Sequence, residues 1–303
     1  MSITKWTSML KAETEKAMAA AGIEGEVFVK TYTKSNDREV RTISIRTNEG
    51  AVSPAIPIQR LWDNFEEGAC MEELAKDVID SSLEAWNSEV PPNELFTEYD
   101  KVKQFLRVKI LDKKYNKCYL AGCMHLEFPS GLVLAPELRY PIESEADEGG
   151  HWSITITNEM AKLQNYDKDE TMNQAIKNTV ENEEPILFAL SKGFATENPE
   201  TIEIGAEMDR EEAYVLTTTY HRFGATFLLT RPDIFEAIRQ EYGDFWILPS
   251  SRHELIFVSK ASGNKLDKLK QTVRNANNSV VSKEDFLSND VFEYTENGLS
   301  RAV

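Results

Sequence analysis

The chain has 303 residues, of which 41% are hydrophobic and 28% are charged, a composition typical of a globular protein with a sizeable core. The 51 acidic and 34 basic residues give a formal net charge of −17, which argues against binding to the nucleic-acid backbone and against adsorption to anionic lipid. The three cysteines are too few for a disulfide framework, and no signal peptide or membrane-length apolar run is present, so we expect a cytoplasmic protein.

Hydrophobic periodicity in the N-terminal third predicts helices that pack on a small antiparallel sheet. Ile3, Trp6 and Leu10 recur at helical spacing, whereas the segments after Gly25 alternate apolar and polar side chains as strands do. Two prolines in the last of these strands restrict it to a sheet edge. The predicted elements are helices at residues 2–21 and 74–86 and strands at residues 27–32, 42–46 and 51–58. The dipeptide Pro91-Pro92 breaks the chain and is a candidate domain boundary.

The middle of the chain predicts short strands between helices. Val102, Phe105 and Leu106 indicate a helix, and Asn158 is placed to cap another. The predicted elements are helices at residues 99–110, 158–163 and 168–180 and strands at residues 132–134 and 153–157.

The last hundred residues follow a strand-strand-helix order twice. The predicted elements are strands at residues 214–219 and 226–229, a helix at 232–242, strands at 245–248 and 255–258, a helix at 266–276 and a strand at 291–294. This order is typical of an antiparallel sheet with helices on one face. We therefore predict an α+β protein with mixed, mainly antiparallel sheets and helices packed on one face. We expect two lobes, at residues 1–150 and 151–303.

Strong catalytic and cofactor motifs are absent from the sequence. It contains no phosphate-binding glycine loop, no dinucleotide-binding fingerprint and no nucleophile elbow. His253 begins a segment that resembles a zinc-protease motif, but Phe257 stands where the second histidine is needed. Cys118, Cys123 and His125 lie close in sequence but lack a fourth ligand. We therefore expect no metal site, no cofactor and no catalytic residues.

Two polar turns in the C-terminal part are the candidate binding site. Loops held by a rigid sheet commonly carry binding groups, and two histidines and two arginines at one sheet edge could hold an anionic or polar ligand. Turn chemistry alone explains the same residues, as tight turns whose serines satisfy backbone groups and whose His253 pairs with a nearby carboxylate. The candidate binding residues are Tyr220, His221 and Arg222 in the first turn and Ser250, Ser251, Arg252, His253 and Glu254 in the second.

Several segments share a pattern with one known family. They are residues 52–56, 96–103, 156–159, 214–217, 223–225, 248–254 and 287–292, the sixth reading Leu-Pro-Ser-Ser-Arg-His-Glu. On these segments the chain resembles an uncharacterised bacterial family of unknown function that is common in Gram-positive anaerobes. It departs from that family at Asn289-Asp290, where Asp-His is usual. The resemblance implies one α+β architecture from about residue 23 to 295, and it implies no reaction, substrate or cofactor.

Three function hypotheses follow from these observations. We expect a non-enzymatic cytoplasmic binding or regulatory protein that recognises a protein or a small ligand through the loops of the C-terminal sheet. The first alternative is a hydrolase that uses the turn Ser250-Ser251-Arg252-His253-Glu254, with His253 as the base. The second is an acidic decoy of a nucleic-acid-binding protein, encoded by a mobile element, which needs carboxylates spaced like phosphates.

Overall fold

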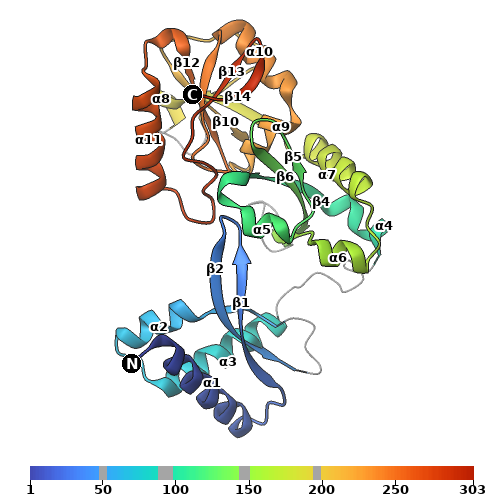
Figure 1. Cartoon of the computed structure of the whole chain (residues 1–303), viewed down its shortest axis with the longest axis vertical. Helices are drawn as coiled ribbons and strands as arrows, with labels where there is room; N and C mark the ends of the chain where they lie inside the picture. The colour runs from blue at the N-terminus through green and yellow to red at the C-terminus, as the bar shows by residue number, and fades with distance from the viewer. Residues whose placement is uncertain (48–52, 88–97, 143–150, 194–198) are drawn as a thin grey trace. The chain divides into compact units, whose positions relative to one another are not determined.

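The computed structural model describes residues 1–47, 53–87, 98–142, 151–193 and 199–303. The chain divides into two compact units, Met1–Asn93 and Glu94–Val303 (Figure 1). Both units combine helices with antiparallel sheets, which confirms the predicted α+β class. None of the helices in these ranges has the length and hydropathy that crossing a membrane requires.

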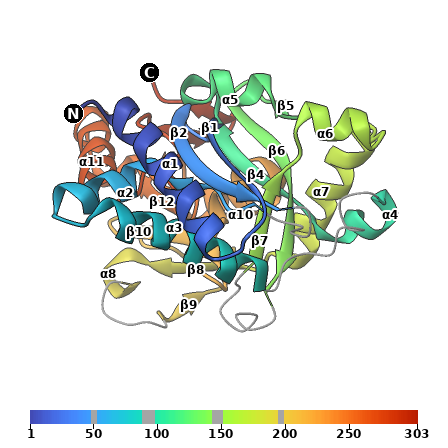
Figure 2. The same ribbon diagram turned by 90° about the horizontal axis from the view of Figure 1, so that it is seen from below.

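The first unit is a three-stranded antiparallel sheet covered by helices. Its elements are α1 (Ile3–Ala20), β1 (Glu26–Lys34), β2 (Arg38–Arg46), β3 (Ile56–Pro57), α2 (Ile58–Glu66) and α3 (Met71–Asn87). The strands lie in the order β1-β2-β3, and Val27 pairs with Ile45. These apolar side chains form one core with Trp6, Leu10 and the buried faces of α2 and α3. Figure 2 shows α1 beside α3 over the sheet. The predicted helices and the first two strands are confirmed, and the proline-containing β3 lies at the sheet edge.

The second unit is built on two antiparallel sheets that share a core. The four-stranded sheet contains β4 (Leu106–Asp112), β5 (Leu126–Glu127), β6 (Leu132–Pro141) and β7 (His151–Thr155). The seven-stranded sheet has the order β14-β13-β11-β12-β10-β8-β9. Its strands are β8 (Pro185–Ala189), β9 (Thr201–Ile202), β10 (Ala213–Thr218), β11 (Phe245–Leu248), β12 (Leu255–Ser259), β13 (Phe292–Thr295) and β14 (Gly298–Arg301). Val108 and Leu134 from the first sheet belong to the same buried cluster as Leu216, Phe245 and Phe257 from the second.

Eight helices of this unit surround the two sheets. They are α4 (Tyr99–Val102), α5 (Lys117–Ala121), α6 (Asn158–Leu163), α7 (Lys168–Asn182), α8 (Leu190–Gly193), α9 (Phe227–Thr230), α10 (Pro232–Tyr242) and α11 (Leu266–Ser279), within the described ranges. Pro232 begins α10 in the first turn, where a backbone nitrogen has no hydrogen-bond partner within the helix, so the missing N–H of proline costs nothing. Gly243 ends the helix with a positive φ of 77°. The apolar face between them is buried, which confirms the predicted helix.

Two predicted elements are wrong. The predicted helix at residues 99–110 ends at Val102, and β4 follows a single 3-10 turn at Lys103–Phe105. The residues after this turn form a strand because their side chains alternate between the two faces of the sheet and their backbone pairs with β6. The predicted strand at 226–229 is replaced by the end of a 3-10 turn at Thr226 and the short helix α9, since a run of three apolar residues does not distinguish strand from helix. The strands that pair with β10 are β12 and β8 instead.

The division between the units does not coincide with the predicted boundary at residue 150. Strands β6 and β7 pair with each other on either side of that position, with Tyr140 opposite Trp152 and Arg139 opposite Ser153. A division there would separate two hydrogen-bonded strands of one sheet. The other candidate boundary, Pro91-Pro92, lies outside the described residues, next to the division at Asn93.

Candidate functional site

The two predicted turns contact each other at one end of the seven-stranded sheet. The Gly224 amide donates a hydrogen bond of 2.9 Å to the His253 carbonyl, and the Thr217 hydroxyl donates one of 2.7 Å to the same oxygen. A Cβ atom on Gly224 would lie 2.5 Å from the Thr217 Cα atom. It would also lie 2.9 Å from the His253 carbonyl oxygen of the second turn, so this close approach of the two turns requires glycine.

His253 has both ring nitrogens engaged within the second unit. Nδ1 accepts a hydrogen bond of 3.2 Å from the Phe223 amide, and Nε2 lies 2.8 Å from an Asp285 oxygen. An acceptor at Nδ1 and a carboxylate at Nε2 assign the proton to Nε2. Burial lowers the pKa of His253, the hydrogen bond to Asp285 opposes this, and the charge of Arg252 lowers it further. This arrangement leaves no ring nitrogen to activate Ser250 or Ser251.

The serines of the second turn serve its backbone. Ser250 and Ser251 are buried, and the Ser251 hydroxyl accepts a hydrogen bond of 3.0 Å from the His253 amide. Burial raises the pKa of Glu254, partly offset by a hydrogen bond with Ser251. The geometry is therefore that of a tight turn in which a serine satisfies a backbone group.

Asp285 is a member of this cluster that sequence reasoning missed. It lies 3.2 Å from the Arg252 guanidinium and accepts a hydrogen bond of 2.7 Å from Ser282. The hydrogen bonds of Ser282, His253 and Arg252 together outweigh burial and hold the pKa of Asp285 below its usual range. The residue is 32 positions from His253 in sequence, so no local pattern connects the two.

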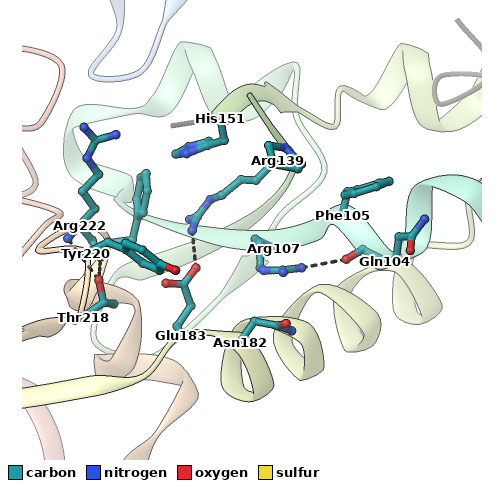
Figure 3. A pocket seen from close by; sticks show the side chains of 12 residues that line it. Gln104, Phe105, Arg107, Arg139, His151, Asn182, Glu183, Thr218, Tyr220 and Arg222 are labelled. Atoms are coloured by element: carbon teal, nitrogen blue, oxygen red, sulfur yellow. Dashed lines mark hydrogen bonds and ion pairs between the residues drawn. The ribbon is translucent and has the colours of Figure 1, made fainter. Parts of the chain in front are cut away.

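A cavity of about 370 Å³ opens beside the first turn (Figure 3). Its walls carry three arginines and a histidine from four places in the chain: Arg107 on β4, Arg139 on β6, His151 on β7 and Arg222 in the turn after β10. Among the described lining residues the acidic one is Glu183. The cavity thus concentrates positive charge in a chain whose net charge is −17.

The predicted site residues divide between this cavity and the turn contacts. Tyr220 and Arg222, from the first turn, line the cavity. The ring of His221, an exposed residue, lies 6.5 Å from that of Phe188. Arg252 and His253 contact Asp285. The two histidines and two arginines therefore do not converge on one ligand position.

The cavity arginines that sequence reasoning missed belong to a polar face of the four-stranded sheet. Arg107 lies opposite Glu137 on β6, and Glu137 lies opposite Thr155 on β7. The other face of these strands carries Val108 and Leu138, which are buried in the core. The alternation of charged and apolar residues in β4 and β6 is the sequence pattern that indicates this polar face. The helix predicted at 99–110 is incompatible with that alternation, so the face was not predicted.

Arg139 is held rigidly. Its guanidinium lies 2.7 Å from both Glu137 and Glu183 and donates a 3.0 Å hydrogen bond to the Val108 carbonyl. It also stacks over the Phe223 ring at 3.7 Å from the centroid. Each guanidinium nitrogen thus has a partner and one face of the group packs on Phe223, so these contacts fix the position of Arg139.

Arg107 and Arg222 are held differently. The Arg107 guanidinium donates to the carbonyls of Gln104 and Leu106 at 3.0 and 2.9 Å. Burial lowers its pKa, Glu183 opposes this, and the neighbouring Arg139 charge lowers it further. Arg222 is exposed. Within the described residues, neither guanidinium forms an ion pair with a carboxylate.

The described segments contain no group of three His, Cys, Asp or Glu side chains placed to hold a metal ion. Cys123 is buried and Cys118 is exposed. The guanidinium groups at the cavity offer positive charge and hydrogen-bond donors.

The surroundings of His253 predict that its pKa lies below the ordinary value for histidine. We expect its ring to titrate below 6.5, because burial and the Arg252 charge disfavour the imidazolium and Nδ1 already accepts a hydrogen bond. The unfolded chain then takes up the proton at higher pH than the folded chain. The stability contributed by this group is therefore full above about pH 6.5 and falls at lower pH. An NMR titration of the histidine Cε1–H signals checks this, and a midpoint above 6.5 would contradict it.

Comparisons with known proteins agree with the resemblance found in the sequence. No curated protein and no solved structure matches the chain. One family model matches residues 3–296, which is nearly the whole of both units. The chain therefore belongs to the family of unknown function DUF5688.

Proposed function

We propose that this protein is a cytoplasmic, non-enzymatic binding protein that holds a small anionic ligand in the arginine-lined cavity. The observation that carries the proposal is that Arg107 and Arg222 line one cavity without a carboxylate partner in the described residues. Like charges brought together at a partly buried site cost free energy, and a bound anion removes that cost. The chain as a whole has a net charge of −17, so the positive charge of this cavity contrasts with the acidic character of the protein.

The size and composition of the cavity favour a small molecule over a protein surface. A volume of about 370 Å³ lies at the lower end of the range for small-molecule sites. Phe105, Tyr220 and Phe223 supply apolar wall beside the charged groups, as in typical ligand pockets. A chain of this length with only three cysteines suits a reducing compartment and supports the cytoplasmic location.

Thermal unfolding in the presence of simple anions tests the proposal. We expect at least one of inorganic phosphate, sulfate, citrate and glutamate to raise the Tm by about 3 °C near saturation, because a ligand that binds only the folded state stabilises it. The double variant Arg107→Gln, Arg222→Gln should lose this shift.

The matched control is Arg274→Gln, an exposed arginine on α11 that does not line the cavity. It should keep the full shift. If no anion stabilises the wild-type protein, or if the double variant responds like the control, the cavity is not an anion site.

A further inference from the structure

We infer that strand β1 is a docking edge for a second copy of this chain. In the dimer, two β1 strands pair antiparallel about a two-fold axis and join two three-stranded sheets into one continuous sheet. The edge belongs to the first unit, so this interaction is independent of the arginine-lined cavity in the second unit.

Strand β1 is a nine-residue edge strand whose outer side has no strand partner in the described residues. It lies at one end of the sheet order β1-β2-β3. The Lys30 carbonyl faces β2, because it accepts a 3.2 Å hydrogen bond from the Thr42 hydroxyl. Alternate residues of an antiparallel strand direct their backbone groups to opposite sides. The outward N–H and C=O groups therefore belong to Val27, Val29, Thr31 and Thr33.

No other edge strand in the described ranges is as long, and the next longest is already covered. That strand is β4, with seven residues. Its Val108 amide donates a 3.0 Å hydrogen bond to the Thr179 hydroxyl of α7. Its Leu106 carbonyl accepts one of 3.0 Å from the Asn178 side chain of the same helix. In the described residues, β1 receives a side-chain hydrogen bond to its backbone from β2 and from no other element. An edge strand left open in this way is a template for pairing with another chain.

One register of a β1 pair uses the whole strand. Paired residues must both direct their backbone groups toward the partner or both away from it, so an odd-numbered residue pairs with an odd-numbered one. A register centred on Lys30 obeys this rule and pairs every residue, whereas the next permitted registers leave the ends of each strand unpaired. It sets Val27 opposite the partner's Thr33 and Val29 opposite the partner's Thr31. The outward groups then exchange about eight hydrogen bonds with the partner.

The same register matches the side chains on the solvent face of the sheet. Glu26 lies opposite the partner's Lys34, Phe28 lies opposite the partner's Tyr32, and the two-fold axis repeats both pairs. The two charged residues are exposed and the two aromatic residues are half-buried. Glu26 also pairs with Arg46 of its own chain, so its carboxylate lies between two cations in the dimer. Opposite charges and aromatic rings directly across antiparallel strands stabilise the pairing. The strand is thus complementary to itself.

The remaining pair on this face sets Lys30 opposite the partner's Lys30, where like charges oppose the pairing. The Lys30 ammonium lies 4.9 Å from the centroid of the Tyr32 ring on its own strand. It therefore leans along the strand toward the turn of the hairpin, and in an antiparallel partner it leans the opposite way. This separates the two ammonium groups, and each is stabilised by the aromatic ring beneath it.

Sedimentation equilibrium of the full-length protein tests the interface. We expect the average mass to rise from that of one chain toward that of two between about 1 and 200 µM protein, because an interface of one strand pair is small. Thr31→Pro removes an outward N–H and leaves the ladder with β2 intact, since proline is tolerated on the open side of an edge strand. It should weaken dimerisation at least about tenfold. The matched control Thr31→Val keeps the N–H and should dimerise as wild type does.

Two charge variants test the register. Lys34→Glu sets two carboxylates opposite each other, and Glu26→Lys sets two ammonium groups opposite each other. Each variant alone should dimerise about tenfold more weakly than wild type. An equimolar mixture restores both opposite-charge pairs, so it should associate more strongly than either variant alone. Circular dichroism of each variant checks that it is folded.

Three results would overturn the inference. The first is a wild-type protein that stays monomeric up to about 200 µM. The second is a folded Thr31→Pro variant that dimerises with wild-type affinity, since the dimer would then use another surface. The third is a mixture of the charge variants that associates no better than either alone, which would exclude the register centred on Lys30. None of these results bears on the anion site, which the change in Tm tests separately.

Discussion

Replacing Asp112 by alanine is expected to lower the free energy of unfolding of the second unit by about 3 kcal/mol. Asp112 is fully buried at the end of β4. Its carboxylate lies 2.7 Å from the Arg301 guanidinium on β14 and accepts hydrogen bonds from the Ser288 hydroxyl at 2.7 Å and the Lys114 amide at 2.9 Å. Alanine leaves these donors without an acceptor in the protein interior, which costs far more than the loss of a surface pair.

Urea unfolding of matched variants measures this effect. Asp112→Asn keeps an oxygen acceptor and should lose less stability than the alanine variant. Glu200→Ala breaks an exposed pair with Lys192 and should change the free energy by less than about 1 kcal/mol. If Asp112→Ala costs no more than Glu200→Ala, then Asp290, the second partner of Arg301, is sufficient to balance that charge.

Replacing Glu137 by glutamine is expected to cost a similar amount, about 3 kcal/mol at pH 7, with a distinct pH dependence. Burial alone would raise the pKa of Glu137, but the charges of Arg139 and Lys109 outweigh it and hold the pKa at about 2, against an ordinary value of 4.5. The carboxylate lies 2.7 Å from Arg139 and accepts a 3.0 Å hydrogen bond from Ser153. Glutamine fills the same space but leaves the two cations without this counter-charge.

The sign of the pH effect follows from the lowered pKa. The unfolded chain takes up a proton at Glu137 near pH 4.5, before the folded chain does, so the stability that this group contributes is full above pH 4.5 and is lost as the pH falls toward 2. The difference between wild type and Glu137→Gln should therefore be constant above about pH 5 and shrink below it. Urea unfolding at pH 7, 4.5 and 3.5 checks this, and a difference that does not change with pH would contradict the assignment.

Local sequence patterns were sufficient to predict those helices and strands whose hydrophobic periodicity and end residues indicate the same structure. In β2, Ile43 and Ile45 alternate with polar residues, and α10 has both a proline at its start and a glycine at its end. The errors fell where a short apolar run has no such signal. Residues 227–230 form a helix, and residues 106–110 form a strand because β6 is available to pair with them. Pairing partners are a property of the folded unit and not of the segment.

The candidate site shows the same limit more strongly. The polar turn at residues 250–254 was found from its composition, and its contact with the first turn was anticipated, but Asp285 was not. Arg107 and Arg139 are separated from Arg222 by long stretches of chain, and the strand register alone places them on the polar face of one sheet. A shift of the register by one residue would turn both arginines into the apolar core.

The sequence by itself determined the α+β class, the family, and most helices and strands of both units, because periodicity and turn residues act between near neighbours in the chain. It also determined that the chain is acidic and lacks the common catalytic motifs. Only the tertiary structure decided that the division lies at Asn93, that His253 is occupied by Phe223 and Asp285, and that three arginines meet at one cavity. These features depend on contacts between residues far apart in sequence, which no local pattern encodes.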